Sequence, residues 1–268
     1  MGRLRHWRRA LRLVGHLGTG ATISLYLVAR TALGLRTPCL PAVVSWWHRR
    51  LCRTLDLRIV VDGDLTPGAL LVANHVSWLD IPVLGAQAEL AFLAKSEVRA
   101  WPLIGWMAAV AGTLFIDRGG NQAAELSARI GERLAAGVPV VIFPEGTTTD
   151  GRALARFHPR LLAAGQQAGV RVQPVALRYG AEPLPDPIAP FVGNDDLLSH
   201  LARLLAHPGL MVRVSFLPPV DAVGLDRRRL AEHCRVAIAA RLDPSPDSRP
   251  IPISSPAEPA HVVLEPAA

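Results

Sequence analysis

The stretch NHVSWLD, residues 74–80, directly follows the apolar run ALLVA, residues 69–73. A short apolar run bounded by turn residues is typical of a buried β-strand. A helix is expected to open with Ile81 and Pro82, since Pro is tolerated in a first helical turn, and Ser77 or Asp80 can be its capping residue. The stretch therefore predicts a strand–turn–helix unit, in which a rigid scaffold holds the side chains of the turn.

The spacing of His75 and Asp80 suits a general base and the carboxylate that orients it. Asp80 can hydrogen-bond one ring nitrogen of His75, which fixes the tautomer and stabilises the imidazolium that forms. No protein nucleophile is expected beside the pair, so the nucleophile would be a hydroxyl of the substrate. Nine His and thirteen Asp in 268 residues give about 0.4 chance matches to this spacing. A capping Asp beside a surface His is therefore an equal alternative from this stretch alone.

From residue 57 onward, predicted strands alternate with predicted helices. The strands are expected at residues 57–61, 69–74, 90–94, 113–116, 138–143, 172–179 and 211–216. The helices are expected at residues 81–86, 102–111, 121–136, 159–168, 195–206 and 225–242. This rhythm predicts an α/β domain over residues 57–243, with a largely parallel sheet flanked by helices. Ligands of such sheets bind beyond the carboxyl ends of the strands.

Polar residues follow four of these strands. Besides His75, Lys95 is the only lysine among 29 basic residues, which suggests a need for a compact ammonium group. Arg118 precedes two glycines and suits an anion clamp. Glu145 can accept hydrogen bonds from a polyol, and Gly146 allows backbone N–H groups to approach an oxyanion. The alternatives are a surface lysine, a solvated arginine and an ordinary Pro-Glu-Gly turn.

The first 56 residues form a separate, basic segment. Residues 1–60 carry eleven Arg and one Asp, a net charge of +10, which leaves −3 for the rest of a chain of net charge +7. Aromatic and apolar residues interleave with these arginines, which favours a membrane interface over nucleic acid. Stacking on single-stranded nucleic acid is a minor alternative.

Three interpretations of this segment compete. The uncharged stretch 17–29 is shorter than the roughly 20 residues that a spanning helix needs. We favour a helix that lies in the cytoplasmic leaflet, followed by a second helix at about residues 41–55, with the arginines on the cytoplasmic side. A signal peptide, with Arg8 and Arg9 as a twin-arginine pair, and a tilted single span are the alternatives.

Several other chemistries lack their motifs. The three cysteines are far apart and form no Cys-x-x-Cys pair, so neither a disulfide framework nor a cysteine metal site is predicted, and a reducing compartment is expected. The sequence has no Gly-x-Ser-x-Gly elbow, no complete dinucleotide loop and no Walker loop. We expect neither a metal nor a cofactor. Residues 244–268 are rich in Pro, Ser and Ala, which predicts a disordered tail.

Four blocks resemble, in order, those of the lysophosphatidic-acid acyltransferase family of membrane glycerolipid acyltransferases. They are NHVSWLD, KSEVRAWPLIGWMAAVAGTLFIDR, FPEGT and VQPVAL, between about residues 57 and 180. The resemblance implies an α/β acyltransferase fold with a membrane-docked N-terminal helical pair, and transfer of a fatty acyl group from acyl-CoA or acyl carrier protein to a lysolipid hydroxyl. The charge and apolar runs of the first 56 residues predict that this segment docks on the cytoplasmic face of a bacterial inner membrane. It implies that His75 is the general base and that Asp80 orients it. It also implies an acceptor site lined by Lys95, Arg118, Glu145, Gly146 and Thr147.

Two departures from the family pattern concern the acceptor. Many members have Arg where this chain has Thr148, and Lys where it has His158, so two cations that help to hold a phosphate are replaced. The leading expectation is a 1-acylglycerol-3-phosphate O-acyltransferase that forms phosphatidic acid. The alternative acceptor is lyso-ornithine lipid or another lysolipid, since FPEGTTTDG looks closer to that bacterial branch. A non-catalytic lipid-binding membrane protein is the alternative of a different class.

Overall fold

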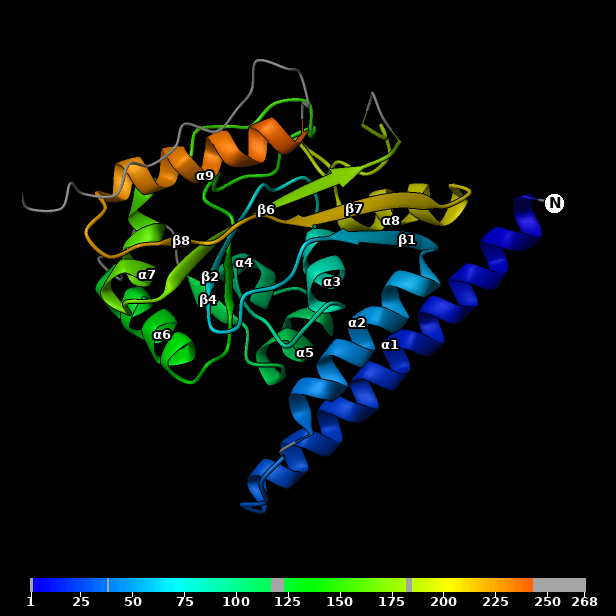
Figure 1. Ribbon diagram of the computed structural model, residues 1–268. Coiled ribbons are helices and arrows are strands. Elements are labelled where there is room, and N and C mark those ends of the chain that lie inside the picture. The colour runs from blue at the N-terminus through cyan, green and yellow to red at the C-terminus, as the bar shows by residue number, and fades with distance from the viewer. Residues whose placement is uncertain (1, 38, 117–122, 182–184, 243–268) are drawn as a thin grey trace, which may run out of the picture.

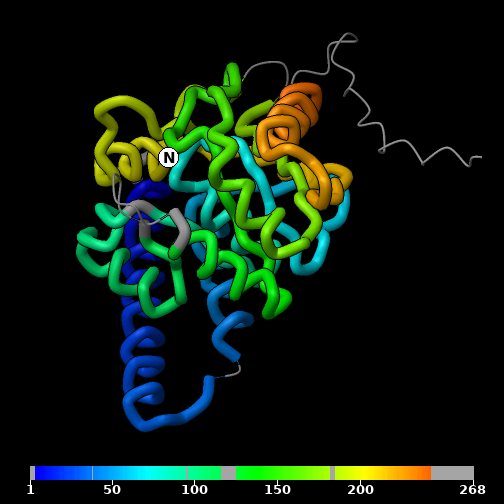
Figure 2. Tube along the Cα trace, turned by 90° about the vertical axis from the view of Figure 1, so that its left-hand side faces the viewer, coloured from blue at the N-terminus to red at the C-terminus, as the bar shows by residue number. Residues whose placement is uncertain are grey.

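The computed structural model describes residues 2–37, 39–116, 123–181 and 185–242. It begins with two long helices that lie side by side and project beyond the rest of the molecule, α1 (Gly2–Ala32) and α2 (Leu40–Thr54) (Figures 1 and 2). The strands that follow are β1 (Leu57–Asp62), β2 (Leu70–Ala73), β3 (Ala91–Lys95), β4 (Leu114–Ile116), β5 (Val140–Ile142), β6 (Arg171–Tyr179), β7 (Leu210–Phe216) and β8 (Val220–Asp221). The later helices are α3 (Asp80–Gly85), α4 (Ser96–Arg99), α5 (Ile104–Val110), α6 (Ala123–Ala135), η1 (Pro159–Leu162), α7 (Ala163–Gln167), α8 (Leu197–Ala206) and α9 (Arg227–Leu242).

The strands form one mixed sheet of order β1-β7-β6-β2-β5-β3-β4, with β8 paired to β6. Strands β6, β2, β5, β3 and β4 are parallel, whereas β7 runs antiparallel to β6 and pairs in parallel with β1. The carboxyl ends of five parallel strands therefore meet at one edge. Since β1 and β7 run the opposite way, they begin at that same edge.

Both faces of the sheet are covered, which explains why its central strands are continuously apolar. All four residues of β2 are fully buried, and they alternate between two clusters. Leu71 and Ala73 pack in the cluster that includes side chains of α2, α3 and α8. Leu70 and Val72 pack in the cluster that includes side chains of α6 and α9. Figure 1 shows α9 and the helical pair on opposite sides of the sheet.

Of the two projecting helices, α2 bonds to α3, the helix that carries Asp80, and to the residue just after it. The Cys52 thiol donates to the carbonyl of Pro82 over 3.4 Å, and the Arg49 guanidinium donates to the carbonyl of Ala86 over 3.1 Å. Between the two long helices, the His16 ring lies 4.3 Å from the Trp47 ring, centroid to centroid. Within the described ranges, no helix combines the length and the apolar composition that crossing a membrane requires.

The predicted fold is confirmed, with specific corrections. The expectation that Ser77 or Asp80 caps a helix was wrong, because α3 has Leu79 at its N-cap and no side-chain cap bond. The opposite direction of β1 and β7 and the short elements α4 and β8 were not predicted. The predicted tail, residues 244–268, lies outside the described residues.

Candidate active site

The site forms where the loops after β2 and β5 meet at the carboxyl edge of the parallel strands. Strand β2 ends at Ala73 and delivers Asn74 and His75 into its loop. The side chain of Asn74 is buried, donates to the Leu177 carbonyl over 2.9 Å and accepts from the Leu177 N–H over 2.7 Å. Because both groups of the amide bond to β6, the start of the His75 loop is fixed to the neighbouring strand.

His75 and Asp80 form the predicted pair. The His75 Nδ1 atom lies 2.7 Å from Asp80 Oδ2, and the histidine side chain is 21% exposed whereas the aspartate is fully buried. A carboxylate only accepts hydrogen bonds, so in the neutral imidazole Nδ1 carries the proton and Nε2 keeps a lone pair. The imidazole also stacks on Phe143 from the loop after β5, with ring centroids 4.1 Å apart and planes inclined by 19°. The ring is therefore fixed on two sides, with Nε2 available as a base.

The Asp80 carboxylate is hydrogen-bonded to the backbone of the loop after β2. Its Oδ2 atom also accepts the N–H groups of Val76 and Ser77, over 2.8 and 3.1 Å. Its Oδ1 atom accepts the hydroxyl of Tyr179 over 2.7 Å. Sequence reasoning missed Tyr179 because it considered charged groups at the strand ends. The available signal was that this tyrosine ends a predicted strand at the same edge.

Glu145 links the two loops through the backbone. It is 3% exposed, and its two carboxylate oxygens accept the N–H groups of His75 over 2.7 Å and of Ala155 over 2.8 Å. Burial raises the pKa of the Glu145 carboxyl, while these two N–H groups act in the opposite direction. The carboxylate thus joins the backbone of His75 to that of Ala155. The acceptor contact expected of Glu145 stays a prediction.

The residues after Glu145 complete the connection. Gly146 has φ of 68°, a conformation that favours glycine, and its N–H donates to the Phe143 carbonyl over 3.1 Å. Thr147 is exposed. The Thr149 N–H donates to the His75 carbonyl over 2.8 Å. These bonds form a turn beside His75, whereas contact of Gly146 and Thr147 with an acceptor stays a prediction.

The segment before α8 also contacts both loops. The Phe191 N–H donates to the Val76 carbonyl over 3.0 Å, and the Thr148 hydroxyl donates to the Phe191 carbonyl. The Trp78 ring N–H donates over 2.9 Å to Nδ1 of the buried His200. Thr148, at a position where many family members carry Arg, therefore bonds to the backbone beside the site.

Two predicted residues, Lys95 and Arg118, remain. Lys95 is the last residue of β3, at the same edge of the sheet as His75. Arg118 lies outside the described residues. Among the residues that the structure describes, no group of three His, Cys, Asp or Glu side chains is arranged to hold a metal ion.

Comparisons with known proteins identify the family of the chain. The profile of the Acyltransferase family matches residues 58–178. A lyso-ornithine lipid O-acyltransferase from Pseudomonas aeruginosa is 46% identical, over 90% of this chain and 95% of that protein. A 1-acyl-sn-glycerol-3-phosphate acyltransferase from Neisseria meningitidis is 35% identical, over 66% of this chain and 71% of that protein.

A solved structure shares the fold. It is the crystal structure of a 1-acyl-sn-glycerophosphate acyltransferase from Thermotoga maritima, with a TM-score of 0.66 at 22% identity. The superposition covers 90% of this chain and 96% of that chain, so the similarity includes both the sheet and the N-terminal helices.

Proposed function

Since the chain belongs to the acyltransferase family, we propose that it transfers a fatty acyl group from a thioester donor to the free hydroxyl of a lysolipid. The single observation that supports this reaction best is the His75–Asp80 pair, with Nδ1 bonded to the carboxylate and Nε2 available. The donor is acyl-CoA or acyl carrier protein, and no bound cofactor takes part.

In the proposed reaction, His75 is the general base. Nε2 takes the proton from the acceptor hydroxyl as its oxygen attacks the thioester carbonyl, and the buried Asp80 carboxylate stabilises the imidazolium. The tetrahedral intermediate then expels the thiolate, which receives the proton from His75. The products are an ester and a free thiol. Glu145 serves this step by fixing the backbone N–H of His75.

For the acceptor, we rank lyso-ornithine lipid first and lysophosphatidic acid second. The relative that is 46% identical carries the lyso-ornithine name. A zwitterionic head group needs less cationic density than a phosphate monoester, which fits Thr148 and His158 in place of two cations. Lysophosphatidic acid remains the second candidate because Lys95 and Arg118 are present, and because acyltransferases named for this acceptor are also similar.

We expect kcat/KM for lyso-ornithine lipid to exceed that for lysophosphatidic acid by about ten-fold or more, because specificity is a difference between two transition-state affinities. Both are measured with the purified protein and the same acyl-CoA. Efficient use of lysophosphatidic acid without use of lyso-ornithine lipid would reverse this ranking and leave the proposed reaction in place.

We further propose that α1 and α2 dock the protein on the cytoplasmic face of a bacterial inner membrane. Helix α1 carries a row of large apolar side chains at helical spacing, each at least 43% exposed: Leu4, Trp7, Leu11, Val14, Leu25 and Val28. A row of this kind on an otherwise folded protein suits burial in a lipid interface.

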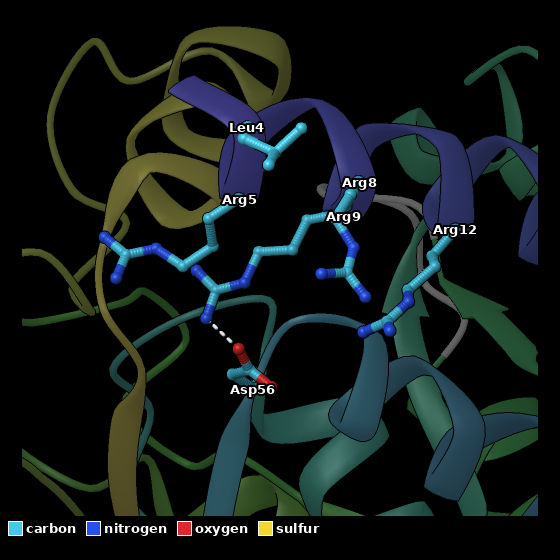
Figure 3. Close-up of a pocket in the computed structure, with 6 residues that line it drawn as sticks. All are labelled: Leu4, Arg5, Arg8, Arg9, Arg12 and Asp56. Carbon is cyan, nitrogen blue, oxygen red and sulfur yellow. Dashed lines mark hydrogen bonds and ion pairs between the residues drawn. The ribbon is translucent and has the colours of Figure 1, made fainter. Parts of the chain in front are cut away.

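Arginines flank the beginning of this row. Four of them surround a hollow of about 380 Å³ together with Leu4 and Asp56 (Figure 3). Arg9 is buried, pairs with Asp56 and donates to the carbonyls of Leu205, in the last turn of α8, and Pro208, just beyond it. Arg5, Arg8 and Arg12 are exposed, which suits contact with anionic head groups. This end of α1 contacts Asp56, just before β1, so docking here would bring the lipid surface to the edge of the sheet that carries His75.

The double variant Leu11→Ser/Val14→Ser should bind vesicles of phosphatidylglycerol and phosphatidylethanolamine about 10²-fold more weakly, because two exposed apolar side chains no longer enter the lipid. Flotation measures the bound fraction. The control Leu198→Ser/Val223→Ser removes side chains of the same types and similar exposure elsewhere. Equal losses in both variants, or complete release of the wild-type protein by salt alone, would contradict docking through α1.

A further inference from the structure

The second oxygen of the Asp80 carboxylate has a partner that no family block supplies. Oδ2 faces His75 and accepts three N–H donors, whereas Oδ1 accepts the hydroxyl of Tyr179 over 2.7 Å. The aspartate is fully buried and the tyrosine is 2% exposed. Each oxygen of the carboxylate is therefore hydrogen-bonded, and these bonds fix the orientation of the carboxylate plane.

The direction of this hydrogen bond is fixed. Burial first, and the Asp80 carboxylate second, raise the pKa of the Tyr179 hydroxyl well above its usual value, so it keeps its proton and donates. Hydrogen bonds from neutral donors to a buried carboxylate are among the stronger ones. The bond thus stabilises the form of Asp80 that accepts from His75.

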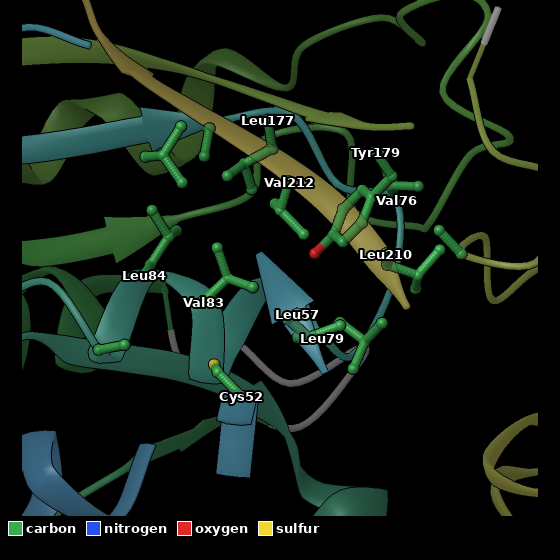
Figure 4. Close-up of a cluster of buried hydrophobic side chains, with 14 of the residues drawn as sticks. Cys52, Leu57, Val76, Leu79, Val83, Leu84, Leu177, Tyr179, Leu210 and Val212 are labelled. Atoms are coloured by element: carbon green, nitrogen blue, oxygen red, sulfur yellow. The ribbon is translucent and has the colours of Figure 1, made fainter. Parts of the chain in front are cut away.

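The tyrosine ring is held rigidly. Figure 4 shows it within a cluster of buried apolar side chains that includes Val76, Leu79 and Val83, with its hydroxyl pointing into the cluster. Val76 and Leu79 belong to the loop between His75 and Asp80. Tyr179 ends β6, the neighbour of β2, so the sheet fixes the phenol relative to that loop.

We propose that Tyr179 is a positioning residue of the acyl transfer, which acts through Asp80 by keeping Oδ2 directed at His75 Nδ1. Rotation of an aspartate carboxylate about its terminal torsion costs little energy. With Oδ1 anchored by Tyr179, rotation of the carboxylate would break a bond at each end. Without the hydroxyl, the carboxylate can turn away and leave the imidazolium less stabilised at the moment of proton transfer. This inference rests on the proposed reaction.

The direct test is Tyr179→Phe, which removes one oxygen and keeps the ring. We expect kcat to fall about ten-fold, with the KM for the lysolipid within about two-fold of wild type, because the hydroxyl acts on the chemical step and not on binding. Ser215→Ala is the matched control, since it also removes a buried hydroxyl that donates to a carboxylate, that of Asp62, at the opposite edge of the sheet. It should leave both constants unchanged.

A double-mutant cycle separates positioning from a general structural role. In an Asp80→Asn background, Tyr179→Phe should cause no further fall in kcat, because residues that act as a unit are not additive. The same fold-loss in both backgrounds would overturn the inference, and so would wild-type kcat in Tyr179→Phe. If the wild-type protein itself transfers no acyl group, the proposed reaction fails instead.

A spectroscopic measurement covers the case in which Tyr179→Phe does not fold. In a Tyr26→Phe protein, Tyr179 is the only tyrosine, so growth on 3-fluorotyrosine gives a single ¹⁹F resonance. We expect Asp80→Asn to shift this resonance and His233→Ala to leave it in place, because α9 covers the face of the sheet opposite to Tyr179. A resonance that does not respond to Asp80→Asn would contradict the contact on which the inference depends.

Discussion

Replacing His75 with alanine should reduce kcat by about 10²–10⁴-fold, the usual contribution of general-base catalysis. Its Nε2 is the group that the geometry leaves available to take a proton, because Nδ1 is committed to Asp80. The ring is part-exposed and its backbone N–H bond to Glu145 does not depend on the side chain, so the loop should persist without the imidazole.

The matched control for this variant is His233→Ala. His233 is partly exposed on α9, so its loss should leave turnover unchanged. Circular dichroism and the thermal midpoint would show that both variants fold. A His75→Ala protein that retained more than about a tenth of wild-type turnover would contradict a base that contributes 10²-fold or more.

Asp80→Asn should also reduce kcat by about 10²-fold or more, although it removes no volume. The carboxylate accepts at both oxygens, whereas an amide accepts at one and donates at the other. If the NH2 of the amide faces His75, it donates to Nδ1. The proton of the imidazole then lies on Nε2, which can no longer act as the base. If it faces Tyr179, the tautomer survives but the negative charge that stabilises the imidazolium is lost. Both orientations impair the reaction.

Asp62→Asn is the control for this loss. Asp62 also takes part in a network, with ion pairs to Arg213 and Arg241, but it lies at the carboxyl end of β1, at the opposite edge of the sheet. We expect this substitution to affect the free energy of unfolding and not kcat. Equal losses of kcat in the two variants would show that any disturbed carboxylate network impairs the protein, and would contradict a specific role for Asp80.

Much of the fold was predictable because local patterns determine it. The fully buried β2 is a continuous apolar run, and glycines mark turns such as the one after α6. The order of the strands was not predictable, since pairing such as that of β1 with β7 joins residues about 150 positions apart and depends on packing of both faces. The apolar pattern of β7 does not indicate whether the strand runs parallel or antiparallel to its neighbours.

In the site, too, the local part was predictable and the long-range contacts were not. His75 and Asp80 are five residues apart, so a local argument found them. The bonds from Glu145 to His75 and from Tyr179 to Asp80 join residues 70 and 99 positions apart. They exist because β5 and β6 both neighbour β2. Sequence reasoning therefore placed Glu145 at the correct edge but did not foresee its backbone partners.

The most direct test of the central claim is the rate of thiol release from acyl-CoA by the purified protein, with and without lyso-ornithine lipid. The account predicts acceptor-dependent release, with one ester formed for each thiol and the rate abolished or nearly so in His75→Ala. Thiol release at the same rate without any lysolipid, which would mean hydrolysis of the thioester, or no release with any lysolipid, would contradict it.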